Sequence, residues 1–377
     1  WLLNQYVRHI AMPFSDSSLP QVTWLQDVLS QHSTEALQPV KQTPNDLALL
    51  QYTGGTTGVS KGATLLHSCL ISALLASDAW VKPGLERHGG ITGDMISICA
   101  LPLYHVFAFV SVSLLSTRKG GLCVLIPNPR DMDATIKEMA KYKFHTFPAV
   151  NTLFGALARH PDAKSVDWSH LRLSVGGGMA VQAATAELWR KQTGCSICEG
   201  YGLSETSPSA CCNPTDRSEY TGTIGVPLPS TELSILDEEG RHLAAGEVGE
   251  IAIRGPQVMA GYWNRPKETA AVMTDDGFFR SGDIGVMSAD GTFKIVDRKK
   301  DMINVSGFNV YPNEIEEVVT RMPGVVEAAA IAIPDEASGE AVKLFVVRND
   351  EAIGEDEIRS YCKANLTGYK RPRVIEF

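Results

Sequence analysis

Short apolar runs alternate with amphipathic stretches along the first half of the chain. Four runs have the length and apolar content of buried strands: 46–53, 95–102, 121–127 and 171–178. Two stretches carry apolar residues at helical spacing, at 67–80 and 131–143, and Asp131 is the expected N-cap of the second. Strands that alternate with helices in this way favour a mostly parallel sheet covered by helices.

The pattern changes near residue 220. Short strands with Gly and Pro turns follow, at 246–255 and 288–298, and predict a β-rich subdomain over 220–297. The elements expected after Arg298 are one helix and two strands, at 312–322, 325–333 and 341–347. We therefore predict an α/β chain with a large domain over 1–297 and a small α+β domain over 298–377.

Composition and charge narrow the class of protein. The chain has 377 residues, of which 44% are apolar and 20% charged, as in a soluble globular protein of two or three domains. Its net charge of −9 disfavours binding to nucleic acid. The apolar run at 69–77 is far shorter than the roughly 20 residues of a membrane span. Because the chain opens on Trp1 without an initiator Met, we expect it to begin partway through a longer protein.

Eight cysteines lack the regular spacing of a disulfide framework and fit a reducing compartment. Cys195 and Cys198 form a CxxC motif, with Cys211 and Cys212 downstream, which is a possible zinc pattern. No second CxxC pair and no nearby histidine completes the set. We interpret these cysteines as small apolar residues that fill a strand and its end.

The segment TGGTTGVSKG at 53–62 combines glycines, hydroxyl groups and Lys61. Its backbone N–H groups and hydroxyls suit a polyphosphate, although Lys61 is not followed by the Ser or Thr of the GxxxxGK[ST] loop. A Gly/Thr-rich hairpin turn with an incidental lysine is the alternative. The density of hydroxyl residues (Thr53, Thr56, Thr57 and Ser60) favours phosphate binding.

Three later segments hold further candidates. In EGYGLSETSP (199–208), the tyrosine offers a face for a base and Glu205 offers a carboxylate for a divalent ion, the alternative being a solvated polar loop. Asp283 could accept from ribose hydroxyls, or could belong to a simple turn. The run 297–301 mixes three cations with two acids, which is typical of an ion-paired surface, but its place at the composition change suggests a hinge.

Taken in order, these segments resemble the adenylate-forming superfamily, and within it the bacterial long-chain fatty-acid–CoA ligases. The most specific stretches are LQYTGGTTGVSKGA, LPLYHVFAF, VNTLFGAL, GGGMAV, EGYGLSETSP, GPQVMAGYW, DRKKDMINVSGFNVYPNEIE and LTGYKRPRVIEF. The resemblance implies a multi-layer α/β fold, with βα subdomains and a β-rich subdomain in the large domain. It also implies that ATP activates a carboxylic acid as acyl-AMP, which coenzyme A then converts to acyl-CoA.

The resemblance assigns roles to matching residues. The nucleotide-binding set is Thr53, Gly54, Gly55, Thr56, Thr57, Gly58, Val59, Ser60, Lys61, Gly62, Gly176, Gly177, Gly178, Gly200, Tyr201, Gly202, Asp283 and Arg298. Within this set Tyr201 is expected to stack on adenine, and Asp283 and Arg298 to hold the ribose. Thr56 and Glu205 are expected to flank Mg²⁺.

Three further assignments concern the acid, the hinge and coenzyme A. His105 matches the histidine beside the acyl carboxylate, with a core histidine at a helix start as the alternative. Lys300 occupies the hinge position, and Gly307 and Phe308 match the backbone that contacts the pantetheine arm. The family usually has Trp-Leu-His-Thr where this chain has Phe-Phe-Arg-Ser at 278–281, which weakens any inference about acyl chain length.

The segment 105–116 indicates which class of acid is activated. It contains no Asp or Glu to pair with a substrate ammonium, which argues against an amino acid, and its apolar residues suit an alkyl chain. The resemblance favours a long-chain fatty acid. An aryl or medium-chain acid, another carboxylate-adenylating activity, and a fragment that only binds nucleotide stay open as alternatives.

The remaining expectations concern partners and the end of the chain. Coenzyme A is expected to dock on Lys299, Lys370, Arg371 and Arg373, unless these are ordinary surface cations. The family's adenylation lysine lies beyond Phe377, so we expect nucleotide binding but slow adenylation. We expect a cytoplasmic protein, and peripheral contact with the inner membrane stays open.

Overall fold

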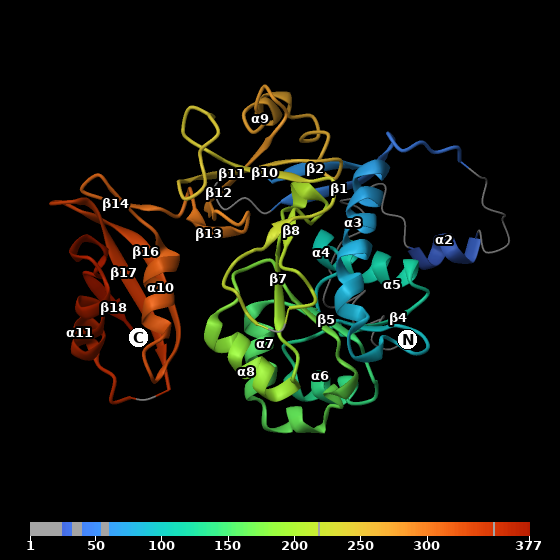
Figure 1. Cartoon of the computed structure of the whole chain (residues 1–377), viewed down its shortest axis with the longest axis horizontal. Helices are drawn as coiled ribbons and strands as arrows, with labels where there is room; N and C mark the ends of the chain where they lie inside the picture. Colours follow the sequence, from blue (N-terminus) through green and yellow to red (C-terminus); the bar gives the residue numbers. More distant parts are fainter. Residues whose placement is uncertain (1–24, 32–39, 54–59, 218, 350) are drawn as a thin grey trace. The chain divides into compact units, whose positions relative to one another are not determined.

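The computed structural model describes residues 25–31, 40–53, 60–217, 219–349 and 351–377. The chain divides into two units, residues 1–43 and 44–377. In the first unit the described secondary structure is the helix α2 (Leu25–Gln31). The second unit holds the sheets and the candidate sites described below (Figure 1).

A seven-stranded sheet organises the first half of the second unit. Its order is β4 (Leu122–Leu125), β3 (Ile96–Cys99), β5 (Thr146–Ala149), β6 (Leu173–Gly176), β7 (Ile197–Tyr201), β8 (Cys211–Cys212) and β9 (Val226–Pro227). The first five strands are parallel and the last two antiparallel. The predicted strands at 95–102, 121–127 and 171–178 are confirmed as β3, β4 and β6.

Helices precede and connect the parallel strands. α3 (His67–Leu85) leads from the β-strand Lys61–Leu66 to β3, and α6 (Met132–Met139), α7 (Asn151–Arg159) and α8 (Ala183–Thr193) connect parallel strands of the sheet. Figure 1 shows α3 in blue on one side of β7 and α8 in green on the other. Asp131 caps α6 as predicted, accepting a hydrogen bond from the Ala134 N–H at 3.0 Å. No helix in the described part of the chain combines the length and apolar character needed to cross a membrane.

An aromatic cluster fills the space between the sheet and two helices. Phe147 of β5 stacks on Trp189 of α8, with ring centroids 5.5 Å apart, and Phe154 of α7 meets the same indole edge-on at 4.9 Å. All three side chains are fully buried. Large buried aromatic surfaces dominate the energetics of a core, so this cluster fixes α7 and α8 against the sheet.

A short helical region follows β3 and approaches the strand ends. It begins as α4 (Val106–Ala108), continues as a π-helical segment (Phe109–Leu114) and ends as α5 (Leu115–Arg118). Val106, Ala108, Val110 and Val112 are fully buried in it. Wide helical turns of this kind are frequent at functional sites.

The glycine-rich segment joins two strands of a hairpin. β1 (Leu47–Thr53) pairs antiparallel with β2 (Lys61–Leu66), and Thr53 lies opposite Lys61. The strand predicted at 46–53 is confirmed as β1, but its predicted burial is wrong: Leu47 and Tyr52 are 43% and 56% exposed. β1 belongs to a two-stranded sheet, and within the described ranges its strand partner is β2 alone, so its other edge lacks a strand partner there.

A four-stranded antiparallel sheet follows, as the pattern after residue 220 predicted. Its order is β10 (Glu232–Leu236), β11 (Val248–Arg254), β12 (Phe279–Met287) and β13 (Phe293–Arg298), with the helix α9 (Pro266–Ala270) between β11 and β12. Ile251, Ile253, Phe279 and Phe293 are buried in the cluster that this sheet shares with the β1–β2 hairpin.

The last part of the chain has its own hydrophobic cluster, drawn from residues 303–375. Its elements are β14 (Ile303–Val305), β15 (Phe308–Val310), α10 (Pro312–Thr320), β16 (Val325–Asp335), β17 (Gly339–Arg348), α11 (Glu355–Asn365) and β18 (Val374–Glu376). A two-residue turn joins β14 to β15, in which Ser306 and Gly307 both have positive φ. The predicted helix at 312–322 and the two predicted strands after it are confirmed.

The loop after β7 packs closely around Gly202, and a substitution at this position tests that packing. A Cβ at this position would lie 1.7 Å from the Pro208 carbonyl oxygen. We therefore expect Gly202→Ala to lower the free energy of unfolding by about 3 kcal/mol or more in urea titrations. Gly368→Ala, where a Cβ would meet no atom within 4 Å, is the control and should change it by less than about 1 kcal/mol. Equal effects in the two variants would contradict the packing.

Candidate active site

A cavity runs along the parallel strands and reaches their carboxyl ends, where the exposed His105 lines its mouth. It encloses about 960 Å³, including the solvent space at its mouth. His105, Gly177, Gly178 and Gly202 line it beyond the ends of β3, β6 and β7. The rest of the lining is mainly apolar and comes from α3, the π-helical segment and the faces of β5, β6 and β8. Ligands bind at the carboxyl ends of strands in sheets of this type.

The segments Gly176–Gly178 and Gly200–Gly202 lie close together at the mouth because their glycines lack side chains: a Cβ on Gly177 would lie 3.5 Å from the Gly200 carbonyl oxygen. A Cβ on Gly176 would lie 2.5 Å from Val181 and 2.9 Å from Ile197. A Cβ on Gly177 would lie 3.1 Å from the Phe107 ring. The structure therefore brings Gly176–Gly178 and Gly200–Gly202 together around one cavity, as the sequence led us to expect.

Asp283, Tyr201 and Arg298 form a second part of the site. The Tyr201 hydroxyl donates to Asp283 Oδ2 at 2.6 Å, and the Arg298 guanidinium lies 3.5 Å from Oδ1. Asp283 is buried, and burial raises the pKa of its carboxyl despite the opposing effects of Tyr201 and Arg298. Burial and the adjacent carboxylate raise the pKa of Tyr201 well above its ordinary value, so its hydroxyl stays a donor.

Glu205 is also buried, but its partner was not foreseen from the sequence. The Tyr262 hydroxyl donates to Glu205 Oε1 at 2.8 Å, and the Lys61 ammonium lies 5.1 Å from the centre of the Tyr262 ring. Tyr262 thereby connects the carboxylate with the cation of the hairpin. It lies within the stretch GPQVMAGYW, which marked the resemblance but had no role assigned to it.

The structure describes the two strands of the β1–β2 hairpin but not all of the residues between them. The Ser60 hydroxyl donates to the Thr53 carbonyl at 2.7 Å, and the Thr53 hydroxyl to the Lys61 carbonyl at 3.4 Å. Gly62 packs under the Tyr52 ring. Six predicted phosphate-binding residues lie outside the described residues: Gly54, Gly55, Thr56, Thr57, Gly58 and Val59.

His105 begins α4 and faces the cavity. Its Nδ1 accepts a hydrogen bond from the Phe107 N–H at 3.2 Å, so the ring caps the helix. The packing around the ring lowers the pKa of His105, although the side chain keeps contact with solvent. The alternative of a core histidine is therefore wrong. With Nδ1 an acceptor, the neutral ring carries its proton on Nε2.

Glu199 is a buried carboxylate that the sequence did not single out. Its Oε1 accepts a hydrogen bond from the Val181 N–H at 3.0 Å, just after the segment Gly176–Gly178. The Tyr220 hydroxyl donates to the Val181 carbonyl, so both the backbone N–H and the backbone carbonyl of Val181 have hydrogen-bond partners. Burial raises the pKa of Glu199 to about 7.

The hinge and coenzyme A candidates lie apart from the cavity lining. Asp297 is buried at the end of β13 and accepts from the Asn313 N–H, at the start of α10, at 2.9 Å. Lys300 exerts an electrostatic effect on Asp283. Gly307 and Phe308 lie on the β14–β15 hairpin, where Phe308 stacks on Tyr369 at 4.7 Å.

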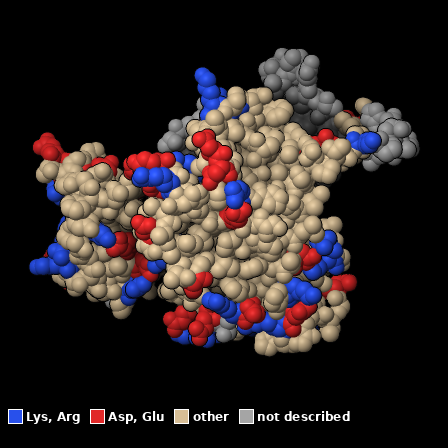
Figure 2. All heavy atoms as spheres, turned by 45° about the horizontal axis from the view of Figure 1, so that its top comes forward, with Lys and Arg blue, Asp and Glu red and all other residues tan. Residues whose placement is uncertain are grey.

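The four cations expected to bind coenzyme A already have partners. Lys299 lies 3.6 Å from Glu250, Lys370 2.6 Å from Glu314, and Arg373 2.6 Å from Asp335. Arg371 donates to the carbonyls of Leu366 and Lys363. Figure 2 shows the same mixing of both charges on one face of the molecule. These cations do not form an unpaired basic patch.

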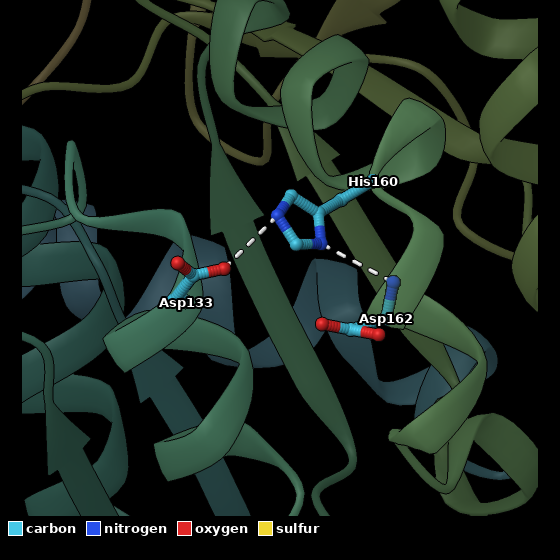
Figure 3. A group of neighbouring side chains, drawn as sticks. All are labelled: Asp133, His160 and Asp162. Carbon is cyan, nitrogen blue, oxygen red and sulfur yellow. Dashed lines mark hydrogen bonds and ion pairs between the residues drawn. The ribbon is translucent and has the colours of Figure 1, made fainter.

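Neither of two possible metal clusters has the features of a metal site. Cys195, Cys198 and Cys211 are buried small residues at β7 and β8, as predicted. Among the described residues, the group that brings three ligand atoms within 4.8 Å of one another is Asp133, His160 and Asp162, and not the cysteines (Figure 3). His160 Nδ1 accepts from the Asp162 N–H, and Nε2 lies 3.3 Å from Asp133. Helix capping and an ion pair account for both nitrogens of the His160 ring.

Comparisons with known proteins agree with this arrangement. The profile for AMP-binding enzymes matches residues 8–263, and that for their C-terminal domain matches residues 314–377. Long-chain-fatty-acid–CoA ligases of Escherichia coli O157:H7 and Salmonella typhimurium are 46% and 47% identical over 378 residues, which cover all of this chain. The chain spans 66% of the length of each relative.

A solved structure shows the same fold. ATP-bound MatB from Rhodopseudomonas palustris superposes with a TM-score of 0.83 at 34% sequence identity. The alignment covers 91% of this chain and 66% of MatB.

Glu199 should give the chain a distinctive pH dependence. Because burial raises its pKa from 4.5 to about 7, the native state retains this proton over a pH range in which the unfolded chain has lost it. The stability that it contributes is full below about pH 4.5 and decreases by roughly 3 kcal/mol as the pH rises through 7. Glu199→Gln should remove this decrease, as measured by urea unfolding between pH 5 and 8.

The exposed Glu336 supplies the control for this experiment. Glu336→Gln should leave the pH dependence of unfolding as in the wild type. The same slope in Glu199→Gln and the wild type would show that Glu199 is ionised throughout this range.

Proposed function

Because the chain belongs to the family of AMP-binding enzymes, we propose that it activates a long-chain fatty acid with ATP and transfers the acyl group to coenzyme A. The observation that carries the proposal is the continuity of an apolar cavity with the glycine segments and His105 at its mouth. A fatty acid matches this arrangement, because its alkyl chain suits the apolar cavity and its carboxylate suits the polar mouth.

The reaction has two steps. A carboxylate oxygen attacks the α-phosphorus of ATP, which gives acyl-AMP and releases pyrophosphate. The sulfur of coenzyme A then attacks the acyl carbon, its proton is lost to solvent, and AMP leaves. Positioning and charge stabilisation supply the catalysis, so no nucleophilic side chain is required.

His105 is the residue of this chain that we assign to the acid. Its neutral ring has Nε2–H available because Nδ1 accepts from the Phe107 backbone. This N–H would donate to one carboxylate oxygen and leave the other free to attack. A lowered pKa keeps the ring neutral near pH 7, so the carboxylate is not held as a tight ion pair.

For the nucleotide, we assign the ribose hydroxyls to Asp283, supported by Arg298. Asp283 faces Tyr201, whose ring borders the same mouth as Gly200 and Gly202. Adenine would lie against Tyr201 and the two glycine segments. Thr53, Ser60, Lys61 and the hairpin loop between them are assigned to the β- and γ-phosphates.

The residues around Glu205 fit a magnesium ion that accompanies ATP. Mg²⁺ is usually held by one or two carboxylates together with substrate phosphates. Glu205 is buried, and Tyr262 occupies only its Oε1. Glu205, with Thr56 of the hairpin loop, would hold the ion, which would neutralise negative charge on the phosphates when bound.

The proposed binding of coenzyme A requires a movement of the C-terminal part of the chain. Gly307 and Phe308 are assigned to its pantetheine arm, although they do not line the cavity described here. We propose that residues 298–377 act as a small domain that turns at Lys300, relative to a large domain over 1–297. The bond between Asp297 and the Asn313 N–H spans this boundary and would have to adapt.

A cytoplasmic location accompanies this function. All eight cysteines are unpaired, which suits a reducing compartment. ATP and coenzyme A would be met there, and peripheral contact with the inner membrane would give access to fatty acids.

The acid is tested by pyrophosphate exchange into ATP with three kinds of substrate. Oleate should support exchange, and coumarate and amino acids should support it poorly. Preference for coumarate would establish the aryl-acid alternative. Nucleotide binding without exchange for any acid would leave only a nucleotide-binding module.

Asp283→Asn should weaken AMP binding about 10- to 100-fold by calorimetry. The reason is that a hydrogen bond to a charged group is worth about 1.5–3 kcal/mol, and the amide loses that charge. Asp290→Asn, on the exposed turn between β12 and β13, is the control and should bind AMP normally. Wild-type affinity in Asp283→Asn would remove Asp283 from the ribose site.

Tyr262→Phe should weaken Mg²⁺-ATP binding roughly three- to tenfold and leave AMP binding, measured without metal, unchanged. Loss of the hydroxyl leaves the Glu205 carboxylate without its positioning bond, a loss of about 0.5–1.5 kcal/mol. Tyr142→Phe removes a longer, 3.4 Å contact between a Tyr hydroxyl and Glu138 of α6, away from the cavity, and should change neither affinity. An equal loss for ATP and AMP would contradict a metal-specific role.

A further inference from the structure

The far end of the cavity lies at the amino ends of the strands, away from His105. Met95, which precedes β3, and Leu173, the first residue of β6, line it there. Trp80 and Leu85, from the last turns of α3, complete this end. A chain that enters beside His105 and follows the strands therefore meets the end of α3.

Three hydrogen bonds fix this end of α3 to the segment after β8. The Trp80 indole N–H donates to the Asn213 carbonyl at 3.0 Å. The Thr215 hydroxyl donates to the Trp80 carbonyl at 2.9 Å, and it accepts from the Gly84 N–H at 3.1 Å. Thr215 is only 4% exposed, so its bond to the Gly84 N–H is shielded from water, and the two bonds at Trp80 are partly buried.

The segment after β8 is itself held in place. The Asn213 side chain donates to the Glu199 carbonyl at 3.2 Å and accepts from the hydroxyls of Thr221 and Thr223 at 2.9 and 3.0 Å. On the other side, a Cβ on Gly84 would lie 2.9 Å from Thr215, so the glycine permits the close approach of α3. Hydrogen bonds and close packing therefore hold both sides of the contact in place.

Resting on the fatty-acid function proposed above, we propose that Trp80 and Thr215 form the end wall of the acyl cavity and set the longest acyl chain that it accepts. Both residues line the cavity, and the hydrogen bonds at Trp80 run to the segment after β8. Each CH₂ group that enters the cavity is buried until the chain reaches this wall. A longer chain must fold back or leave CH₂ groups in water.

If Trp80 and Thr215 end the cavity, affinity should rise with acyl chain length up to a limit and then stop rising. We call the chain length at this limit the break. Below the break, each added CH₂ should tighten binding about fourfold, which corresponds to about 0.8 kcal/mol. Beyond it, added CH₂ groups should bring no gain. The break should be visible by calorimetry of the whole chain with even-numbered saturated acids from octanoate to stearate.

Trp80→Ala should move the break to acids at least two carbons longer, because the indole no longer closes the cavity. Trp80→Phe keeps an aromatic ring at the wall but is smaller and lacks the N–H, so its break should move less than in Trp80→Ala and stay within one two-carbon step. Leu75→Ala changes an exposed position on α3 and is the matched control, with the wild-type break. Thr215→Ala, which opens the wall from the other side, is the second test and should also move the break to longer acids.

Circular dichroism and AMP affinity verify that each variant is folded. An unmoved break in folded Trp80→Ala and Thr215→Ala would overturn the end wall and leave the proposed function intact. An equal loss of affinity at every chain length would also overturn it, because that is the result of a purely structural role. If no acid of any length binds or supports pyrophosphate exchange, the proposed function fails, and this inference fails with it.

Discussion

The buried carboxylate of Asp283 holds together parts of the site that are distant in sequence. It lies on β12 of the four-stranded sheet, accepts from Tyr201 at the end of β7, and faces Arg298 at the end of β13. A buried carboxylate without such partners would be costly, so each of the three side chains constrains the other two. The consequence is that the edge of the parallel sheet is fixed against the strand that leads to residues 299–301.

The cavity beside these side chains separates polar from apolar surface. The polar groups are at the carboxyl ends of the strands, and the apolar lining continues from there toward their amino ends. An acid bound in this orientation presents its carboxylate where the glycine segments would hold a nucleotide. Holding two reactants in contact removes much of the entropic barrier to their reaction. The fold thus supplies proximity, while the absence of side chains on Gly176 and Gly177 supplies the space.

Sequence patterns predicted the elements whose signal is local. The strands β3, β4 and β6 and the cap of α6 at Asp131 follow from apolar runs and a capping residue. The exposure of β1 did not follow, because it depends on which strands pair with it. The contacts of Tyr262 with Glu205 and of Trp80 with Asn213 span 57 and 133 residues, and no local pattern encodes them. Glu199 was missed for the same reason, since its burial is a property of the assembled sheet.

The most direct test of the account follows one oxygen atom. Oleate labelled with ¹⁸O in its carboxylate is incubated with ATP, coenzyme A and an excess of the chain, in a single turnover, and the AMP is analysed by mass spectrometry. Attack of the carboxylate on the α-phosphorus predicts one ¹⁸O atom in the phosphate of AMP, because that oxygen stays with phosphorus when the thiol displaces AMP. Unlabelled AMP formed together with oleoyl-CoA would contradict an acyl-AMP intermediate, and labelled oleate recovered unchanged with no AMP formed would contradict the activation of a fatty acid.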